Sequence, residues 1–366
     1  MQVKFSRRRW LGLAGGALLA WALPAPARAA TALVPLARWP TGEARLAPVA
    51  AEAGRAYFAG ATSLGLIDPQ AVAPLWQRPH GLPGGAVFRP RLMSDRLVCA
   101  GLRALAAFHA GEGEPLWRYT AKAQIGAPAL GADLVCFGDG HELVALELAT
   151  GGERWRFAAL KDTEIHYAPA VAEDLVYVGP GDGRLYALEA SSGRLVWRLD
   201  RMAEWQYLRQ LHLSGDLLIA GSYKEKLYGL ERATGRQRWA FPAGNFINSQ
   251  HVAAGRVHFW SPTGWLYALE AASGRLLWRH RTTDYTGRAG NWAALHAELV
   301  TSKGWLFALD LSGTLHRLEA ATGGGLTSHP LGEGLHPFVA PLDGRRFFVA
   351  NAAGELLLYA LDVMPA

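Results

Sequence analysis

The sequence has little of what covalent or metal chemistry usually requires. Only two cysteines, Cys99 and Cys136, occur among 366 residues, and they are not adjacent. The twelve histidines are scattered, with neither a His-Glu-x-x-His motif nor a Cys-plus-His spacing of the zinc-binding kind. The Gly-x-Ser-x-Gly motif of α/β-hydrolases is also missing. These absences argue against zinc hydrolases and against hydrolases with a nucleophile elbow.

Charged residues and long apolar runs are also scarce. Charged residues make up 19% of the chain, and the apolar run that ends at Leu23 is too short and too glycine-rich for a good transmembrane helix. The formal charge of +6 includes five basic residues and no acids within residues 1–29, so the rest carries 6 − 5 = +1. A chain with so small a net charge gives no reason to expect binding to nucleic acid.

The first 29 residues have the features of an export signal. A basic start is followed by an apolar run and an Ala-x-Ala end at Ala29. Within it, Ser6-Arg7-Arg8-Arg9-Trp10-Leu11 is similar to a twin-arginine signal, in which Arg7 and Arg8 form the arginine pair. We expect cleavage after Ala29, which leaves a periplasmic protein of 366 − 29 = 337 residues. No cysteine lies near this point, so no lipid anchor is expected.

A repeat of about 40 residues dominates the remainder, 30–366, which we expect to form one domain. Its clearest copy runs from Leu143 to Trp155, and further copies occupy 185–197, 227–239 and 266–278. Looser copies lie at 107–117, 66–76 and 317–327, the last without its Trp. Successive Trp residues from position 76 to 278 are separated by 41, 38, 42, 42 and 39 residues. Such a period, with several short strands per unit, predicts an all-β propeller of four-stranded antiparallel blades.

The two ends of the chain decide the number of blades. Near the C-terminus, residues 358–362 begin another copy of the repeat, but no Gly-x-x-x-Trp follows them. The segment Ala32 to Trp39 supplies the missing strand, so we expect it to complete the last blade and close an eight-bladed ring. A seven-bladed ring is the alternative, and it requires 279–326 to be an insertion rather than a blade.

The repeat chemistry predicts how neighbouring blades adhere. Each outer-strand Trp is expected to lie across the gap between two blades, with its indole N–H donating to the motif Glu or Asp, while the motif Gly frees the turn. The docking tryptophans are Trp39, Trp76, Trp117, Trp155, Trp197, Trp239 and Trp278. The corresponding glycines are Gly113, Gly151, Gly193, Gly235, Gly274 and Gly323.

The cysteines occupy matching places in this repeat. Cys99 ends the string Arg96-Leu-Val-Cys99, and Cys136 ends Asp133-Leu-Val-Cys136. Equivalent positions of adjacent blades lie farther apart than the ~7 Å that a disulfide allows between Cα atoms. We therefore expect two buried free thiols.

The string Ala-x-Glu-x-x-Thr-Gly-x-Glu-x-Trp at 145–155 resembles the tryptophan-docking repeat of the pyrroloquinoline-quinone (PQQ) propeller superfamily. One branch of that superfamily comprises quinoprotein dehydrogenases, which bind PQQ and a metal ion on the propeller axis. Another is the BamB-type propeller of the outer-membrane assembly machinery, which binds protein partners. This chain lacks the adjacent cysteine pair of many dehydrogenases and the lipidated cysteine of the lipoprotein branch.

Candidate binding residues lie in the segments that lead into the inner strands, around the axis. The first three blades have mainly small apolar residues there, as in Ala47-Pro48-Val49 and Ala127-Pro128-Ala129. The later blades carry aromatic, amide and basic groups. The candidates are Glu164, His166, Trp205, Tyr207, Arg209, Asn245, Asn248, Arg288, Asn291, Trp292 and His336. These groups suit a small planar or anionic ligand or a protein partner.

The resemblance and the bare propeller length favour a monomeric, non-enzymatic scaffold or binding module with a periplasmic or outer-membrane protein as partner. We assign no catalytic residue and no metal ligand. The alternative is a PQQ-dependent oxidoreductase, with calcium as the metal, or an accessory protein of one.

Overall fold

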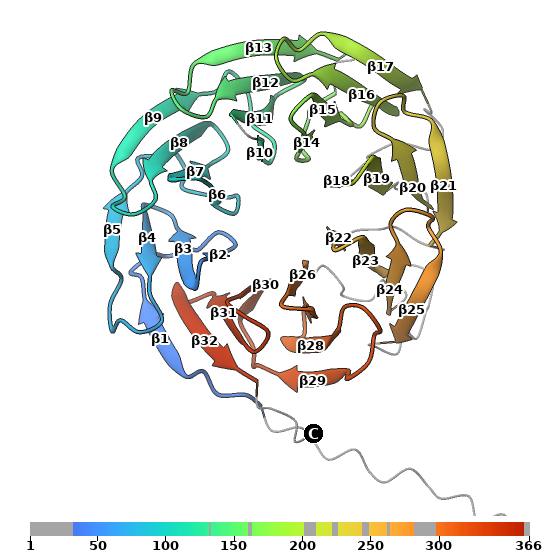
Figure 1. Ribbon diagram of the computed structural model, residues 1–366. Coiled ribbons are helices and arrows are strands. Elements are labelled where there is room, and N and C mark those ends of the chain that lie inside the picture. The colour runs from blue at the N-terminus through green and yellow to red at the C-terminus, as the bar shows by residue number, and fades with distance from the viewer. Residues whose placement is uncertain are drawn as a thin grey trace, which may run out of the picture. The chain divides into compact units, whose positions relative to one another are not determined.

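The computed structural model describes residues 32–131, 133–159, 163–200, 210–221, 226–243, 249–261, 264–281 and 298–361. Within residues 31–366 it shows eight four-stranded antiparallel sheets arranged as a propeller, which confirms the predicted fold (Figure 1). Among the described residues no helix is long and apolar enough to cross a membrane.

The first four blades use consecutive strands from the inside of the ring outward. Blade 1 consists of β2 (Ala50–Glu52), β3 (Arg55–Ala59), β4 (Ser63–Ile67) and β5 (Trp76–Pro79). Blade 2 consists of β6 (Arg91–Met93), β7 (Arg96–Ala100), β8 (Ala104–His109) and β9 (Pro115–Thr120). Blade 3 consists of β10 (Ala129–Gly131), β11 (Leu134–Asp139), β12 (Glu142–Glu147) and β13 (Glu153–Ala158). Blade 4 consists of β14 (Ala170–Val171), β15 (Leu175–Val178), β16 (Arg184–Glu189) and β17 (Leu195–Asp200).

The last four blades differ only in how the ring closes. Blade 5 consists of β18 (Leu211–Ser214), β19 (Leu217–Gly221), β20 (Lys226–Glu231) and β21 (Gln237–Pro242). Blade 6 consists of β22 (Ser249–Ala253), β23 (Arg256–Ser261), β24 (Trp265–Glu270) and β25 (Leu276–Arg281). Blade 7 consists of β26 (Leu299–Ser302), β27 (Trp305–Leu309), β28 (Thr314–Glu319) and β29 (Thr327–Pro330). Blade 8 consists of β30 (Leu335–Pro341), β31 (Arg346–Asn351), β32 (Glu355–Ala360) and β1 (Ala37–Pro40).

The N-terminal strand closes the ring as predicted. β1 pairs antiparallel with β32, from Ala37 opposite Leu358 to Pro40 opposite Glu355. Figure 1 shows this closure where the blue β1 lies beside the red β32. The segment 279–326 contributes most of blade 7 and is not an insertion, so the seven-bladed alternative is wrong.

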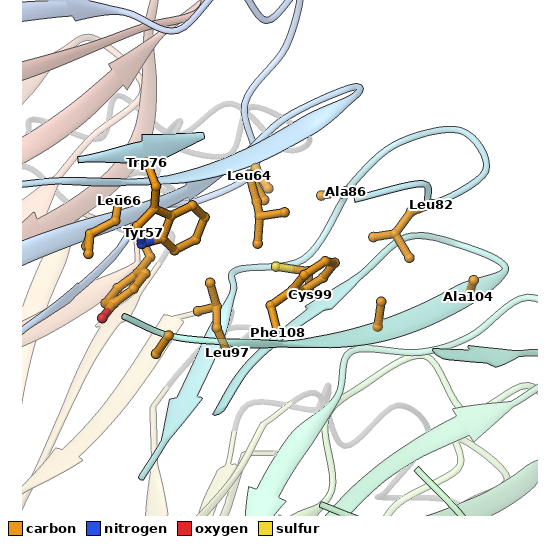
Figure 2. Packing of buried hydrophobic residues seen from close by; sticks show 14 residues of the cluster. Tyr57, Leu64, Leu66, Trp76, Leu82, Ala86, Leu97, Cys99, Ala104 and Phe108 are labelled. Carbon is orange, nitrogen blue, oxygen red and sulfur yellow. The ribbon is translucent and has the colours of Figure 1, made fainter. Parts of the chain in front are cut away.

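The hydrophobic core is divided into clusters that lie between neighbouring blades. One cluster joins Tyr57 and Leu66 of blade 1 to Leu97 and Phe108 of blade 2, as Figure 2 shows. The middle strands of each blade are buried on both faces because each blade is covered by its two neighbours, which explains their continuous apolar runs. Cys99 and Cys136 are buried and free, as predicted.

Candidate functional site

The innermost strands of four blades enclose a cavity of about 400 Å³ beside the propeller axis. Its walls come from blades 7, 8, 1 and 2, whose strands β26, β30, β2 and β6 point toward the centre of the ring in Figure 1. The lining residues are 49–54, 89–92, 300–302 and 339–342. A cavity of this size falls within the range of small-molecule sites.

An ion pair beside this cavity joins two blades that are not neighbours. Arg89, just before β6 of blade 2, donates to both carboxylate oxygens of Glu298, just before β26 of blade 7, with Nη1 at 2.8 Å from Oε1. Blades 8 and 1 lie between these two blades in the ring. The forked geometry is the strongest arrangement between arginine and carboxylate, and it fixes the position of the guanidinium.

A second arginine, Arg91 at the start of β6, has no such partner among the described residues. The side chain of Arg91 lines the cavity and is accessible to water, yet no ion pair or hydrogen bond joins it to any of the described residues. Surrounding protein lowers the pKa of Arg91, and the neighbouring charge of Arg89 lowers it further, while Glu298 acts in the opposite direction. The cavity therefore contains one arginine that is neutralised and one that is not.

Two half-buried histidines, His212 and His251, lie on the inner strands of blades 5 and 6. Burial, and then the charge of Arg91, lower the pKa of His212 to about 4. Burial, and then His212, lower the pKa of His251 to about 4, and its Nε2 lies 2.9 Å from Thr301 Oγ1. Both imidazoles are therefore neutral at pH 7. His212 Nε2 is buried and lacks a hydrogen-bond partner among the described residues.

Most of the site residues predicted from the sequence lie outside the described residues. These are Trp205, Tyr207, Arg209, Asn245, Asn248, Arg288, Asn291 and Trp292. Of the other three, Glu164 and His166 contact each other at 3.3 Å in an exposed loop before β14. His336 lies half-buried on β30, where burial lowers its pKa. Within the described part of the chain, no hydrogen bond or ion pair joins His336 to Glu164 or His166.

The sequence reasoning missed Arg89, Arg91, His212 and His251. The expectation that the first three blades place only small apolar residues near the axis is wrong for blade 2, which supplies both arginines of the cavity. A signal was present, because Arg89-Pro90-Arg91 occupies the place that Ala47-Pro48-Val49 and Ala127-Pro128-Ala129 take in blades 1 and 3.

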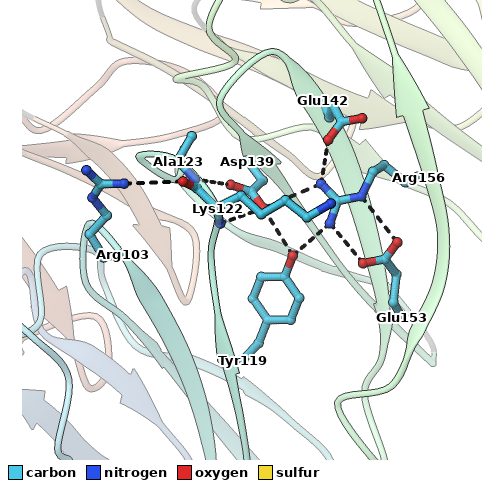
Figure 3. A network of polar contacts seen from close by, with 8 residues as sticks. All are labelled: Arg103, Tyr119, Lys122, Ala123, Asp139, Glu142, Glu153 and Arg156. Carbon is cyan, nitrogen blue, oxygen red and sulfur yellow. Dashed lines mark hydrogen bonds and ion pairs between the residues drawn. The ribbon is translucent and has the colours of Figure 1, made fainter.

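Among the described residues, no group of three or more His, Cys, Asp or Glu side chains could hold a metal ion. The densest ionic network, shown in Figure 3, instead ties blade 2 to blade 3. Arg156 donates to Glu142 at 2.7 Å and to the Tyr119 hydroxyl of blade 2 at 2.9 Å. Burial alone raises the pKa of Asp139, but hydrogen bonds from the backbone N–H groups of Ala123 and Lys122 hold it below its usual value.

The outer-strand tryptophans lie against the motif glycine of the next blade. A Cβ added at Gly193 would come within 2.7 Å of the Trp155 ring, and one at Gly151 within 2.6 Å of Trp117. The predicted indole acceptor is wrong. Trp155 Nε1 donates to the backbone carbonyl of Ala190 at 2.7 Å, and the motif carboxylates accept from Ser or Thr hydroxyls of their own turn. The carbonyl is the better acceptor because the turn backbone lies directly beneath the ring.

The joint between blades 7 and 8 uses a different residue. Leu326 replaces the motif Trp there and is partly exposed. Trp305, on β27, instead approaches Gly344 of blade 8, where an added Cβ would meet its ring at 2.8 Å. The guanidinium of Arg317 lies 3.5 Å from the centroid of the same ring, a cation–π contact.

Solved structures share this fold at low sequence identity. BamB from Moraxella catarrhalis aligns with 18% identity and a TM-score of 0.66, over 90% of this chain and 100% of that one. Sqt1 from Chaetomium thermophilum, bound to the N-terminus of the ribosomal protein L10, aligns with 14% identity and a TM-score of 0.71, over 90% and 100%. A quinohemoprotein alcohol dehydrogenase from Pseudomonas putida aligns with 14% identity and a TM-score of 0.64, over 91% and 77%.

No curated protein matches the sequence significantly. The sequence model of one family, described as "Outer membrane protein assembly factor BamB", matches residues 103–245, 205–296 and 262–364. These overlapping matches together cover residues 103–364, from β8 of blade 2 to β32 of blade 8. The chain therefore belongs to the BamB-like family of PQQ-repeat propellers.

Proposed function

We propose that the chain is an exported, periplasmic scaffold that binds a protein partner and has no catalytic activity of its own. The model of its family carries the description of an outer-membrane protein assembly factor. One protein of the same fold, Sqt1, was solved with the N-terminus of a ribosomal protein bound. The features of the first 29 residues support export by the twin-arginine route.

The observation that carries this proposal is a patch of exposed aliphatic side chains where the ring closes. The four most exposed large aliphatic side chains of the described residues are Val72 (102%), Val34 (78%), Leu36 (64%) and Leu75 (49%). Val34 and Leu36 immediately precede β1, and Val72 and Leu75 lie in the β4–β5 connection of blade 1. We call these four residues the closure patch.

One hydrogen bond brings the two halves of the closure patch together. Trp39 of β1 donates its indole N–H to the carbonyl of Ala71 at 2.9 Å, so the turn that carries Val72 lies against β1. Val72 also occupies the position at which other repeats have the motif glycine. A clustered apolar surface of this kind marks an interaction site, whereas isolated exposed aliphatic residues are normal. A protein with its own apolar side chains is the partner that such a surface suits.

Site-specific photo-crosslinking tests this proposal in the native host. A photoreactive phenylalanine analogue at Val72 is expected to give one discrete adduct, which a second change, Leu36→Glu, abolishes. The matched control is the same analogue at Leu311, an aliphatic residue of similar exposure to Leu75 on a blade 7 hairpin. Absence of an adduct at Val72, or the same adduct at Leu311, contradicts a partner at the closure patch.

A PQQ-dependent oxidoreductase, or an accessory protein of one, is the second candidate. The quinohemoprotein dehydrogenase of the same fold makes PQQ conceivable, and Arg89 and Arg91 suit its carboxylates. The described residues do not complete a PQQ–calcium site, since they offer no aromatic residue in the cavity lining and no cluster of metal ligands. The candidate platforms Trp205 and Trp292 lie outside the described residues.

A thermal-unfolding measurement separates the two candidates. A ligand present at 100 times its dissociation constant stabilises the folded state by about 2.7 kcal/mol. A clear rise in Tm of the mature protein with PQQ and calcium together, but not with calcium alone, supports the quinoprotein. An unchanged Tm at saturating PQQ and calcium refutes it and leaves the scaffold.

A further inference from the structure

From the geometry of the axial cavity we infer that Arg91 is the anchor of a binding site for a small oxyanion, a carboxylate- or phosphate-bearing molecule. This site is separate from the closure patch, which lies at the outer rim of blades 8 and 1. It uses none of the residues singled out from the sequence, and it goes beyond the proposed scaffold function.

The first argument is the charge balance around Arg91. Arg89 and Arg91 lie two residues apart and both line the cavity. Both carboxylate oxygens of Glu298 accept hydrogen bonds from Arg89. Glu52 also lines the cavity, yet among the described residues only Arg89 and Glu298 act electrostatically on Arg91, and Glu52 acts on Tyr57 instead. Among the described residues, Arg91 therefore has no carboxylate within ion-pair distance of its guanidinium.

The second argument is the accessibility of Arg91. The side chain is exposed to the cavity, where a ligand oxygen can reach its forked donors. Because none of the described residues accepts a hydrogen bond from these donors, an oxyanion can bind them without displacing an existing ion pair.

The third argument is the set of polar groups near Arg91, whose charge acts on His212. His212 and His251 are neutral at pH 7, so they add polar atoms without further positive charge. Thr301 lines the cavity and contacts His251 at 2.9 Å. The buried Nε2 of His212, which lacks a partner among the described residues, is the kind of atom that a bound molecule or an ordered water satisfies. The described groups thus favour an anion with several oxygens over a cation or an apolar molecule.

Isothermal titration calorimetry with two probes tests the site. Sodium phosphate and sodium succinate are each titrated into the mature protein at pH 7.5, with ionic strength held constant by sodium chloride. We expect saturable binding of at least one probe, and whichever binds more tightly identifies the phosphate or the carboxylate class. No saturable binding of either probe overturns the inference, whatever the outcome of crosslinking at the closure patch.

Variants assign the binding to Arg91. Loss of a charge-assisted hydrogen bond weakens binding about tenfold or more, so Arg91→Gln is expected to raise Kd by at least that factor. The matched control Arg78→Gln, which removes an exposed arginine on the outer strand β5, is expected to leave Kd unchanged. Equal Kd values for Arg91→Gln and Arg78→Gln overturn the inference.

A second variant keeps the test decisive if Arg91→Gln does not fold. Glu298→Gln removes the carboxylate that competes for the arginines, and it is expected to tighten binding of the same probe severalfold. An unchanged or weaker affinity of Glu298→Gln contradicts an oxyanion site at these arginines. Circular dichroism of each variant establishes that it is folded.

Discussion

Replacing Trp155 by alanine tests how the blades are held together. The ring is 7% exposed, and its N–H bonds to Ala190 of blade 4 at 2.7 Å. A buried indole removes roughly 150–250 Å² from water, an upper bound of about 4–6 kcal/mol. Allowing for partial relaxation of the cavity, we expect Trp155→Ala to lower the free energy of unfolding by about 3–5 kcal/mol.

Urea unfolding of the mature protein measures this loss, and the partly exposed Leu116 on the neighbouring blade provides the control. Leu116→Ala is expected to cost less than about 1 kcal/mol because the side chain is 44% exposed. A loss below about 1 kcal/mol for Trp155→Ala would refute the reasoning that the ring carries the joint between blades 3 and 4.

The glycine beneath the ring makes the test sharper. Gly193 has φ of +71°, and an added Cβ would lie 2.7 Å from the Trp155 ring. Gly193→Ala therefore brings both backbone strain, roughly 1–2 kcal/mol, and a clash with the ring. In the Trp155→Ala background only the strain remains, so the double-mutant cycle should show a coupling of about 1 kcal/mol or more. Additive losses would show that the ring and the glycine are not in contact.

Three other predictions concern the export signal, a histidine near the axis and the two thiols. Changing Arg7 and Arg8 together to lysine should prevent appearance of the 337-residue form in the periplasm, as an immunoblot of cell fractions would show. The pKa of His212 is about 4 in the folded protein and about 6.5 in the unfolded chain. The contribution of neutral His212 to the free energy of unfolding is therefore fully present above pH 6.5 and is lost as the pH falls toward 4. His212→Gln should therefore remove roughly 2 kcal/mol from the loss between pH 7 and pH 5, measured by urea unfolding at both values. Burial raises the pKa of the Cys99 thiol to about 12 and that of Cys136 also, so a thiol reagent at pH 8 should label both only after unfolding.

The repeat made the ring predictable because the same contact recurs at most of the joints between blades. A tryptophan ring lies over the motif glycine of the next blade, so the period can be read from the tryptophan spacing. The number of blades also required the two ends of the chain, because blade 7 has Leu326 in place of the tryptophan. The wrong indole acceptor has a physical reason, since sequence shows side chains and conceals which backbone carbonyl a turn exposes. The sequence therefore suggested a motif carboxylate as the acceptor for Trp155, whereas the structure shows the carbonyl of Ala190.

The axial groups could not be predicted in the same way because they have no repeat. Arg91 and His212 come from strands of three and four residues, too short for any periodicity. Their proximity follows only from ring closure, which brings the inner strands of blades 2 and 5 to the same axis. The comparison of Arg89-Pro90-Arg91 with the equivalent segments of other blades was the one available signal, and it becomes informative only when the blades are already aligned.

The difference between the joints and the axis has an energetic basis. The joints bury large rings and apolar middle strands, so most substitutions there cost several kcal/mol and the motif is retained. The innermost strands contribute only two to seven residues each and pair on one side, so their side chains add little to the stability of the ring. A blade can therefore place two arginines at the axis, as blade 2 does, without disturbing its neighbours. In such a ring the residues that deviate from the repeat on the inner strands are the first ones to test for ligand binding.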